Sequence, residues 1–379
     1  MLASRVDSLL KSAWGVVLGV PLSEAQWSLA NLPVRLGGCG AVSPSRIHPQ
    51  AAIASFLSAA NGDIGIQLGS LPSDLDEALL KLRTAVPEMV GPLIELWSSG
   101  SLAAVLSSEK IDTWVEQKLW SMAVDNAAVI AFDAEACTRM TRLRRLQAGA
   151  HSGAWLTNLP VEKDACAIFS AAEWQALLRF RCGVPMQARS VCAGCASPLD
   201  PFGDHALACA ACGMYARHNR LRDALAEEFR SAGQSVQLEV QLPGGSLRPA
   251  DILLLQPDEP TPAAVDVSVV HPLHLSSPSA EDTPGSFAAA REVDKQSSSA
   301  ADCSRVGWRF SPVCAETTGA WGPGAQRCVR GLVKRRSMRT GEPVAESALI
   351  VWRRLASAVA KGSALLLLWA YPNCFGGGQ

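Results

Sequence analysis

The sequence predicts an α+β multidomain protein with an all-α N-terminal half, a small cysteine-rich segment, and an α/β domain built on a mixed central sheet. In the first half, apolar residues recur at spacings of three and four, which is typical of amphipathic helices. Four cysteines and one histidine then gather within residues 192–212, and strand-like alternation begins after them. A chain of 379 residues with 48% hydrophobic content is long enough for two or three compact domains.

Helical patterns dominate the first half of the chain. Residues 1 to about 60 are expected to form short helices around the turn-rich LPVRLGGCG, where a proline and three glycines interrupt the helical period. From about 70 to 185, the segments DLDEALLKLRTAV, KIDTWVEQKLWSMAV and SAAEWQALLRFRCGV each carry an apolar helical stripe. This region is therefore predicted to be entirely α-helical.

Two apolar stretches could be mistaken for membrane or export signals. SAWGVVLGVPL lies between Asp7 and Glu24 and is not followed by a small-residue cleavage site, so we expect a helix and a turn. SALLLLWAY near the C-terminus is far shorter than the roughly 20 residues of a spanning helix, which favours a packed terminal helix. The other eight cysteines are scattered singly, which fits a reducing compartment better than a disulfide framework.

The segment CAGCASPLDPFGDHALACAAC has the ligand types and spacing of a zinc knuckle. Cys192 and Cys195 form a Cys-x2-Cys hook, and His205 and Cys209 follow it. Three thiolates and one imidazole would complete a tetrahedral structural Zn²⁺ site with no open position. Cys212 repeats the hook spacing after Cys209, so it either replaces Cys209 as the fourth ligand or stays a free thiol.

The C-terminal half has the pattern of a small α/β domain. RHNRLRDALAEEFRSAG predicts a helix that ends near Gly233. VQLEVQL, RPADILLL and AAVDVSVV predict three strands, FAAAREVDKQSSSA a second helix, and WRFSPVCAE a fourth strand. The stretch 275–286 is rich in Ser, Asp and Pro and predicts a loop.

Two acidic residues on neighbouring predicted strands suggest a divalent-metal site. Asp251 follows Arg-Pro-Ala, and Asp266 lies inside an apolar run, where an unpaired carboxylate would be costly to bury. A carboxylate pair with retained waters suits Mg²⁺, which can activate water in phosphodiester hydrolysis, and Glu239 is a possible extra ligand. The alternative is that the Asp side chains bond to backbone amides at a sheet end.

The motifs CxxC…GDHALxC, RHN, RPADILL, VDVSVVHP and ETTGAWGP together resemble the C-terminal part of non-LTR retrotransposon polyproteins. In that family, a zinc knuckle of CCHC type precedes a restriction-like endonuclease of the PD-(D/E)xK fold. PLSEAQWSLANLPVRLGGCGAVSP resembles the thumb of their reverse transcriptase, and GAHSGAWLTNLP with LRFRCGVP resembles their helical linker. The resemblance covers most of the chain, and no YxDD polymerase motif is present.

The resemblance implies a DNA endonuclease without polymerase activity that cuts target DNA for integration. Asp251 and Asp266 match the two Mg²⁺-binding acids. The usual lysine position, two residues after the second acid, holds Ser268, so the catalytic lysine implied is Lys295 on the following helix. The alternative for Lys295 is a solvated residue paired with Glu292 at helical spacing.

The resemblance also implies nucleic-acid partners, namely target DNA and element RNA, and therefore a nuclear location, with no membrane and no small-molecule substrate. The net charge is only −1, so contacts must come from local basic clusters. Each cluster is either a phosphate-binding surface or a solvated helix face. The candidates are Arg217 and His218 of the RHN motif, Arg142, Arg144 and Arg145 with Arg139, and a C-terminal group from Arg327 to Arg339.

The combined patterns divide the chain into five expected segments. These are a thumb remnant at 1–60, a helical linker at 61–185, the knuckle at 186–213, the endonuclease domain at 214–345 and a C-terminal helix at 346–379. Two rival hypotheses remain. One is an inactive zinc-knuckle module of a degraded element that only binds nucleic acid, and the other is a helical interaction protein, which an absence of bound zinc would favour.

Overall fold

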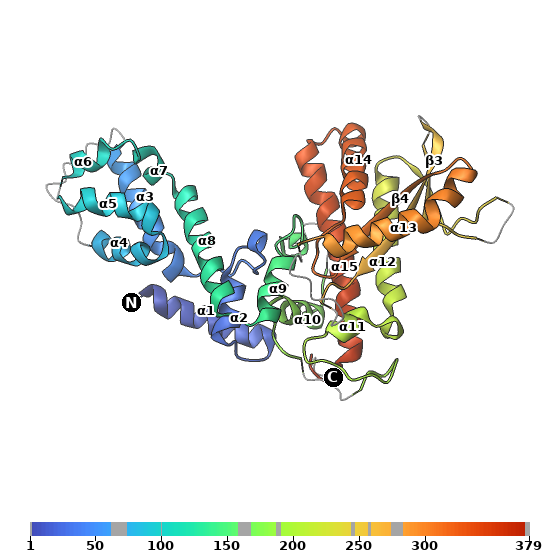
Figure 1. The fold of residues 1–379 in the computed structure, drawn as a ribbon, viewed down its shortest axis with the longest axis horizontal. Coiled ribbons are helices and arrows are strands. Elements are labelled where there is room, and N and C mark those ends of the chain that lie inside the picture. Colours follow the sequence, from blue (N-terminus) through green and yellow to red (C-terminus); the bar gives the residue numbers. More distant parts are fainter. Residues whose placement is uncertain are drawn as a thin grey trace. The chain divides into compact units, whose positions relative to one another are not determined.

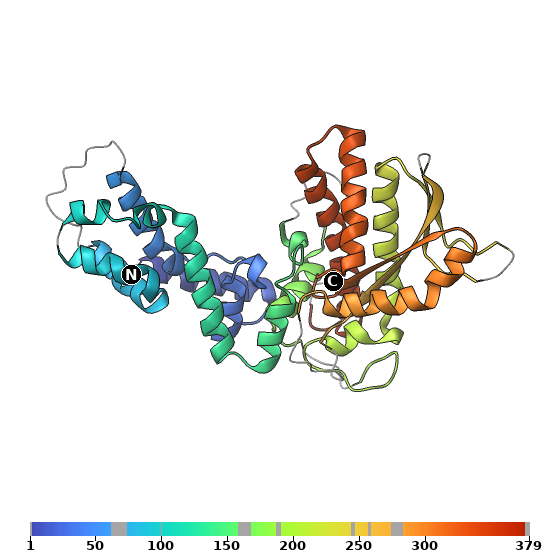
Figure 2. The same cartoon turned by 45° about the horizontal axis from the view of Figure 1, so that its top comes forward.

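The chain forms two compact units in a computed structural model, one made of Met1–Pro33 with Gly40–Cys137, the other of Val34–Cys39 with Thr138–Gln379. The structure describes residues 2–61, 74–99, 101–157, 168–186, 191–243, 247–256, 259–273 and 283–375 (Figures 1 and 2). The five expected segments are a finer division, which these two units do not test. Most of the expected loop at 275–286 lies outside the described residues.

The first unit is helical, as the sequence predicts. Its helices are α1 (Leu2–Leu18), α2 (Glu24–Asn31), α3 (Pro44–Asn61), α4 (Asp74–Ala85), α5 (Pro87–Ser98), α6 (Leu102–Leu106), α7 (Ile111–Val115) and α8 (Gln117–Glu135). The apolar faces of α3 to α8 enclose a core around Trp114 and Trp120, and the Trp120 indole donates to the Trp114 carbonyl. KIDTWVEQKLW is not one continuous helix, because the extended backbone of Glu116 separates α7 from α8.

The second unit contains the remaining helices and the sheet. Its helical elements are η1 (Val34–Leu36), α9 (Thr138–Leu146), η2 (Ala154–Thr157), α10 (Ala171–Arg181), α11 (Asp204–Ala208), η3 (Ala210–Cys212), α12 (Met214–Ser231), α13 (Ser286–Arg305), α14 (Pro323–Thr340) and α15 (Val344–Ala370). The turn LPVRLGGCG joins this unit through Gly37, at φ +91°, where an added Cβ would lie 2.0 Å from the Arg144 carbonyl oxygen. The glycine therefore permits a close backbone approach.

The sheet is mixed, as expected, and has the order β1-β2-β3-β4. Its strands are β1 (Ser235–Leu238), β2 (Ile252–Gln256), β3 (Glu259–Val270) and β4 (Arg309–Glu316). β1 with β2 and β2 with β3 are antiparallel, whereas β3 and β4 are parallel, with α13 as the crossover. β1 is shorter than VQLEVQL predicts, because Glu239 adopts a left-handed φ of +53° that ends the strand.

Alternation along β3 separates the two faces of the sheet. Val265, Val267 and Val269 belong to the main core with α12, α14 and α15, and these three helices lie side by side (Figures 1 and 2). Ala264 belongs to a smaller cluster on the other face, which includes Cys303 of α13. Because successive strand residues point to opposite faces, Asp266 lies on the α13 side.

The C-terminal helix α15 packs as the sequence predicts. Most of its residues from Val351 to Leu367 are buried, and Leu355 and Val359 are part of the main core. Among the described residues, no helix has the combination of length and apolar character that a membrane span requires.

Candidate metal centre and carboxylate–lysine site

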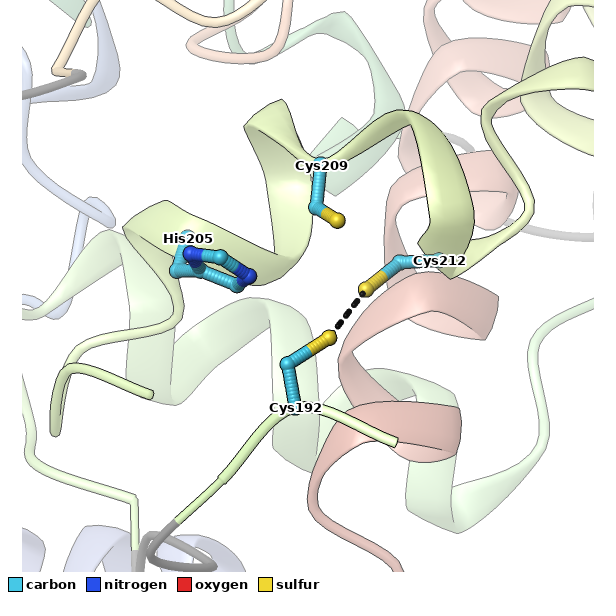
Figure 3. Close-up of side chains that lie close together, drawn as sticks. All are labelled: Cys192, His205, Cys209 and Cys212. Atoms are coloured by element: carbon cyan, nitrogen blue, oxygen red, sulfur yellow. Dashed lines mark hydrogen bonds between the residues drawn. The ribbon is translucent and has the colours of Figure 1, made fainter. Parts of the chain in front are cut away.

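Three cysteines and a histidine converge in the cysteine-rich segment. The ligand atoms of Cys192, His205, Cys209 and Cys212 all lie within 4.8 Å of one another, and Figure 3 shows the side chains directed toward one another. The Sγ atoms of Cys192 and Cys212 are 3.4 Å apart. This Cys3His cluster could bind a zinc ion, since three sulfurs and one imidazole nitrogen form a typical structural zinc donor set.

The local backbone explains why these four residues meet. Asp200 accepts hydrogen bonds from the N–H groups of Phe202, Asp204 and His205, which fixes the first turn of α11 and the histidine on it. An added Cβ at Gly194 would lie 2.7 Å from the Ala211 carbonyl oxygen. Glycine in the hook therefore lets it approach the η3 turn, which ends in Cys212.

The structural cluster differs from the predicted ligand set, in which Cys195 is one of the four ligands and Cys212 is only an alternative to Cys209. Cys195 lies beside the cluster, and Cys212 lies in it. The Sγ atom of Cys195 is 3.3 Å from Nε2 of His205, but the Cys195 side chain is exposed and is not one of the four mutually close residues. The structure therefore brings Cys209 and Cys212 together with Cys192 and His205 and leaves Cys195 at the rim.

The thiols of the cluster have very different proton affinities. Burial opposes ionisation of Cys192, but N–H groups of Cys195 and Gly194 and the neighbouring thiol and imidazole outweigh it and lower the pKa of Cys192 to about 6. Burial and the adjacent thiols instead raise the pKa of Cys212. Since several thiolates at this distance repel one another, a bound cation would stabilise the fully ionised set.

The two predicted acids and the predicted lysine come together in the second unit. Asp266 of β3 accepts a hydrogen bond at Oδ2 from Nζ of Lys295 on α13, at 2.6 Å. Asp251 immediately precedes β2 and accepts at Oδ2 from the Val267 N–H at 2.7 Å. The Asp251 backbone N–H donates to the Val265 carbonyl, so the antiparallel β2–β3 pairing places the carboxyl groups next to each other.

The pKa of Asp266 is raised well above that of an exposed aspartate. Burial raises the pKa of Asp266 to about 6; the Lys295 ammonium group lowers it and the Asp251 carboxylate raises it, without reversing the effect of burial. The side chains of Asp266 and Lys295 are only 12% and 13% exposed. Two neighbouring carboxylates of which one contacts a buried ammonium group form an arrangement that a divalent ion would also stabilise.

The alternative pairing of Lys295 with Glu292 is absent, because Glu292 is used elsewhere. Its buried carboxylate accepts hydrogen bonds from the N–H groups of Gly324 and Ala325 at the start of α14, at 2.6 and 2.9 Å. A carboxylate at a helix N-terminus is stabilised by the exposed N–H groups and the helix dipole. Lys295 is therefore left to pair with Asp266.

Two further predicted residues lie at or near Asp251. His218 on α12 places Nε2 3.1 Å from Oδ1 of Asp251, so it contacts a predicted metal ligand, a role that the sequence did not suggest. Glu239, considered as an extra ligand, instead pairs with Nη1 of Arg222 at 2.5 Å. The only sequence signal for the position of His218 is that the RHN motif opens the helix before the sheet.

Arg217, which is predicted to contact DNA, is buried inside the fold, and this burial argues against that role. Arg217 is 1% exposed, and its guanidinium donates to the carbonyls of Leu207 at 3.0 Å and Val269 at 3.3 Å. Arg144 is also buried, at 7% exposure, with Nη1 donating to the Leu36 carbonyl. Neither guanidinium can reach a phosphate, because both bind backbone inside the fold.

The other arginines of the α9 cluster differ in exposure. Arg139 makes two hydrogen bonds to the Asp204 carboxylate, at 2.8 and 2.9 Å. Arg142 is partly buried and donates to the Pro272 carbonyl. Arg145 is exposed. The cluster is therefore mainly a structural element, and Arg145 is its most accessible candidate for a phosphate contact.

A buried polar chain connects the cysteine-rich segment to the end of β3. Asp204, next to His205, lies 3.3 Å from Nε2 of His271, whose Nδ1 lies 2.6 Å from the Thr317 hydroxyl. Arg217 adds a second connection between the same regions through Leu207 and Val269. The candidate metal centre and the strand that carries Asp266 are thus parts of one packed structure.

Comparison with known proteins gives no assignment: no protein-family model and no curated protein matches this chain.

Proposed function

We propose that this chain is a metal-dependent DNA endonuclease derived from a non-LTR retrotransposon polyprotein. The observation that carries the proposal is the contact between Lys295 and Asp266 beside Asp251. Two acids on neighbouring segments of the sheet and a lysine are the residue types of a PD-(D/E)xK nuclease. The lysine contacts Asp266 from α13, although Ser268 occupies its usual position.

The residues at the site support phosphodiester hydrolysis. The carboxylates of Asp251 and Asp266 are hard oxygen donors that fit Mg²⁺, which would supply Lewis-acid activation of water and of the leaving oxygen. The Lys295 ammonium, held at Asp266, can stabilise charge that develops on a phosphoryl oxygen. His218 orients the Asp251 carboxylate through its contact with Oδ1.

The test of this function is nicking of supercoiled plasmid by the purified chain in Mg²⁺ or Mn²⁺, compared with the same reaction in EDTA. Asp266→Asn should remove cleavage and leave DNA binding intact, because it removes one ligand charge without changing side-chain size. Asp294→Asn is the matched control, since the Asp294 side chain, on the same helix as Lys295, is 70% exposed and lies 3.9 Å from the guanidinium of Arg291.

The outcome also separates the two nucleic-acid hypotheses. Cleavage by the wild type and the Asp294 variant, but not by the Asp266 variant, supports the nuclease. DNA binding without metal-dependent nicking of duplex or nicked substrates would favour the inactive module instead. Target DNA and element RNA remain the proposed partners, and a nuclear location follows from that proposal.

We also propose that the Cys3His cluster forms a structural zinc knuckle. Cys192, His205, Cys209 and Cys212 would hold the ion, and Cys195 at the rim would not be required. Four protein donors would leave no open position on the ion, so its role would be to stabilise the fold rather than to catalyse a reaction.

Metal analysis of protein purified without chelator should find one zinc per chain. His205→Ala and Cys212→Ser should each release it and lower the melting temperature, because zinc-binding energy contributes to folding. Cys195→Ser should retain the metal and serves as the matched cysteine control. Zinc loss in the Cys195 variant with retention in the Cys209→Ser variant would instead assign Cys195 as the fourth ligand.

A further inference from the structure

A cavity on the opposite face of the sheet from Asp266 is lined by several arginines. It lies between α14 and the sheet and has a volume of about 260 Å³. Val265 and Leu254 contribute to its floor, and both belong to the main core, whereas Asp266 follows Val265 in the strand and faces the other way. The cavity is therefore separate from the carboxylate–lysine site.

The charged residues that line this cavity in the described part of the chain are all basic. Arg309 of β4 and Arg327 and Arg335 of α14 all line it, and Arg309 and Arg327 are exposed. Among the described residues that line it, none is acidic. Three guanidinium groups around one small space create a positive potential that favours an anion, and their planar donors match phosphate geometry.

The uncharged residues that line the cavity favour a ligand that has an apolar part and a hydrogen-bond donor as well as an anionic group. Leu254 and Val265 offer an apolar surface next to the arginines. Gln234 also lines the cavity, is 8% exposed, and its side-chain oxygen is buried without a donor among the described residues. An acceptor of this kind calls for a hydrogen-bond donor from a ligand, because a buried polar atom without a partner is costly.

We propose that this cavity binds one nucleotide, with its phosphate on the arginines, its base against the apolar floor, and a base N–H directed to Gln234. A volume of 260 Å³ is slightly below the roughly 300–1,000 Å³ of sites for drug-sized ligands, which fits a single nucleotide-sized group. The nucleotide is either free or the phosphorylated end of a nucleic-acid strand. The proposal does not depend on the nuclease, since Asp251 and Asp266 take no part in it.

The test is binding of AMP, inorganic phosphate and adenosine to the full zinc-loaded chain by calorimetry. AMP should bind more tightly than either of its parts. Arg327→Gln should weaken AMP binding about tenfold or more, because it removes a charge-assisted contact to phosphate. Arg330→Gln is the matched control, since Arg330 is exposed on the same helix but does not line the cavity, and it should leave AMP binding unchanged.

Other variants complete the test. Gln234→Leu should weaken AMP but not inorganic phosphate, and Asp266→Asn should bind AMP as the wild type does. Equal weakening by the Arg327 and Arg330 variants, or equal affinity for AMP and phosphate, would overturn the proposal. A 5′-phosphorylated oligonucleotide that displaces AMP better than its unphosphorylated form would assign the ligand to a strand end, whereas no displacement by either would assign a free nucleotide.

Discussion

Lys295→Ala is expected to slow Mg²⁺-dependent plasmid nicking by about 10²–10³-fold while leaving DNA binding nearly unchanged. The Nζ atom of Lys295 lies 2.6 Å from Oδ2 of Asp266 and so places a cation from α13 beside this predicted metal ligand. Loss of one group that stabilises charge in the transition state typically costs about this much in rate. The measurement is the single-turnover nicking rate at saturating enzyme.

The control for this prediction is a lysine introduced at position 268 of β3 in the variant that lacks Lys295. Ser268 lies two residues after Asp266 on β3, so its side chain is on the same face of the sheet. Ser268→Lys in the Lys295→Ala background should restore part of the lost rate, because it returns a cation to the usual PD-(D/E)xK position. Arg291→Ala, which removes an exposed cation from the same helix, should have little effect. A Lys295→Ala variant that nicks at the wild-type rate would show that Lys295 is only an ion-pair partner.

The elements of the fold were largely predictable because their signals are local. Val265, Val267 and Val269 alternate with polar residues along β3, and the structure has a strand there whose valines face one core. Ser170 and Glu173 form a capping box at the start of α10, where the sequence predicts a helix. Such patterns depend only on the period of the chain and on its end groups.

The deviations arise where single backbone positions decide the outcome. Glu239 ends β1 by adopting a left-handed φ, although the alternation of apolar residues continues beyond it. Glu116 divides a helical stripe into α7 and α8, although its neighbours keep the helical period. Neither residue is a glycine or a proline, so composition gave no signal of a break.

The candidate site was predictable in its residue types but not in its pairings. Spacing brought Asp251 and Asp266 together and located the cysteine-rich cluster, because strand neighbours and short loops place such residues close together. It did not select Cys212 over Cys195 for the group of four mutually close residues. The choice of Lys295 between Asp266 and Glu292 depended on α14, whose N-terminus binds Glu292. That contact joins residues 32 apart in sequence, which no local period encodes.

Arg217 is another residue whose contacts with distant parts of the chain are not encoded by a local sequence pattern. Arg217→Met should destabilise the second unit by about 2–6 kcal/mol, since it leaves two buried carbonyls, those of Leu207 and Val269, without this donor at about 1–3 kcal/mol each. Gly362 of α15 packs against the Arg217 side chain, because an added Cβ there would lie 2.6 Å from its Cγ. The free energy of unfolding in urea measures the effect.

Arg220, which is exposed on the same helix, provides the control that distinguishes a structural role of Arg217 from a DNA contact. Arg220→Met should change stability by less than about 0.5 kcal/mol, because exposed substitutions rarely do more. Gly362→Ala should reproduce part of the Arg217 defect without removing any charge, since the added methyl group displaces the Arg217 side chain from its carbonyl partners. If Arg217→Met instead kept full stability and reduced the salt dependence of DNA binding by about 0.9 in the log–log slope, Arg217 would be a phosphate contact. Its burial and its two backbone acceptors favour the structural role, in which Arg217 joins the cysteine-rich segment to the strand that carries Asp266.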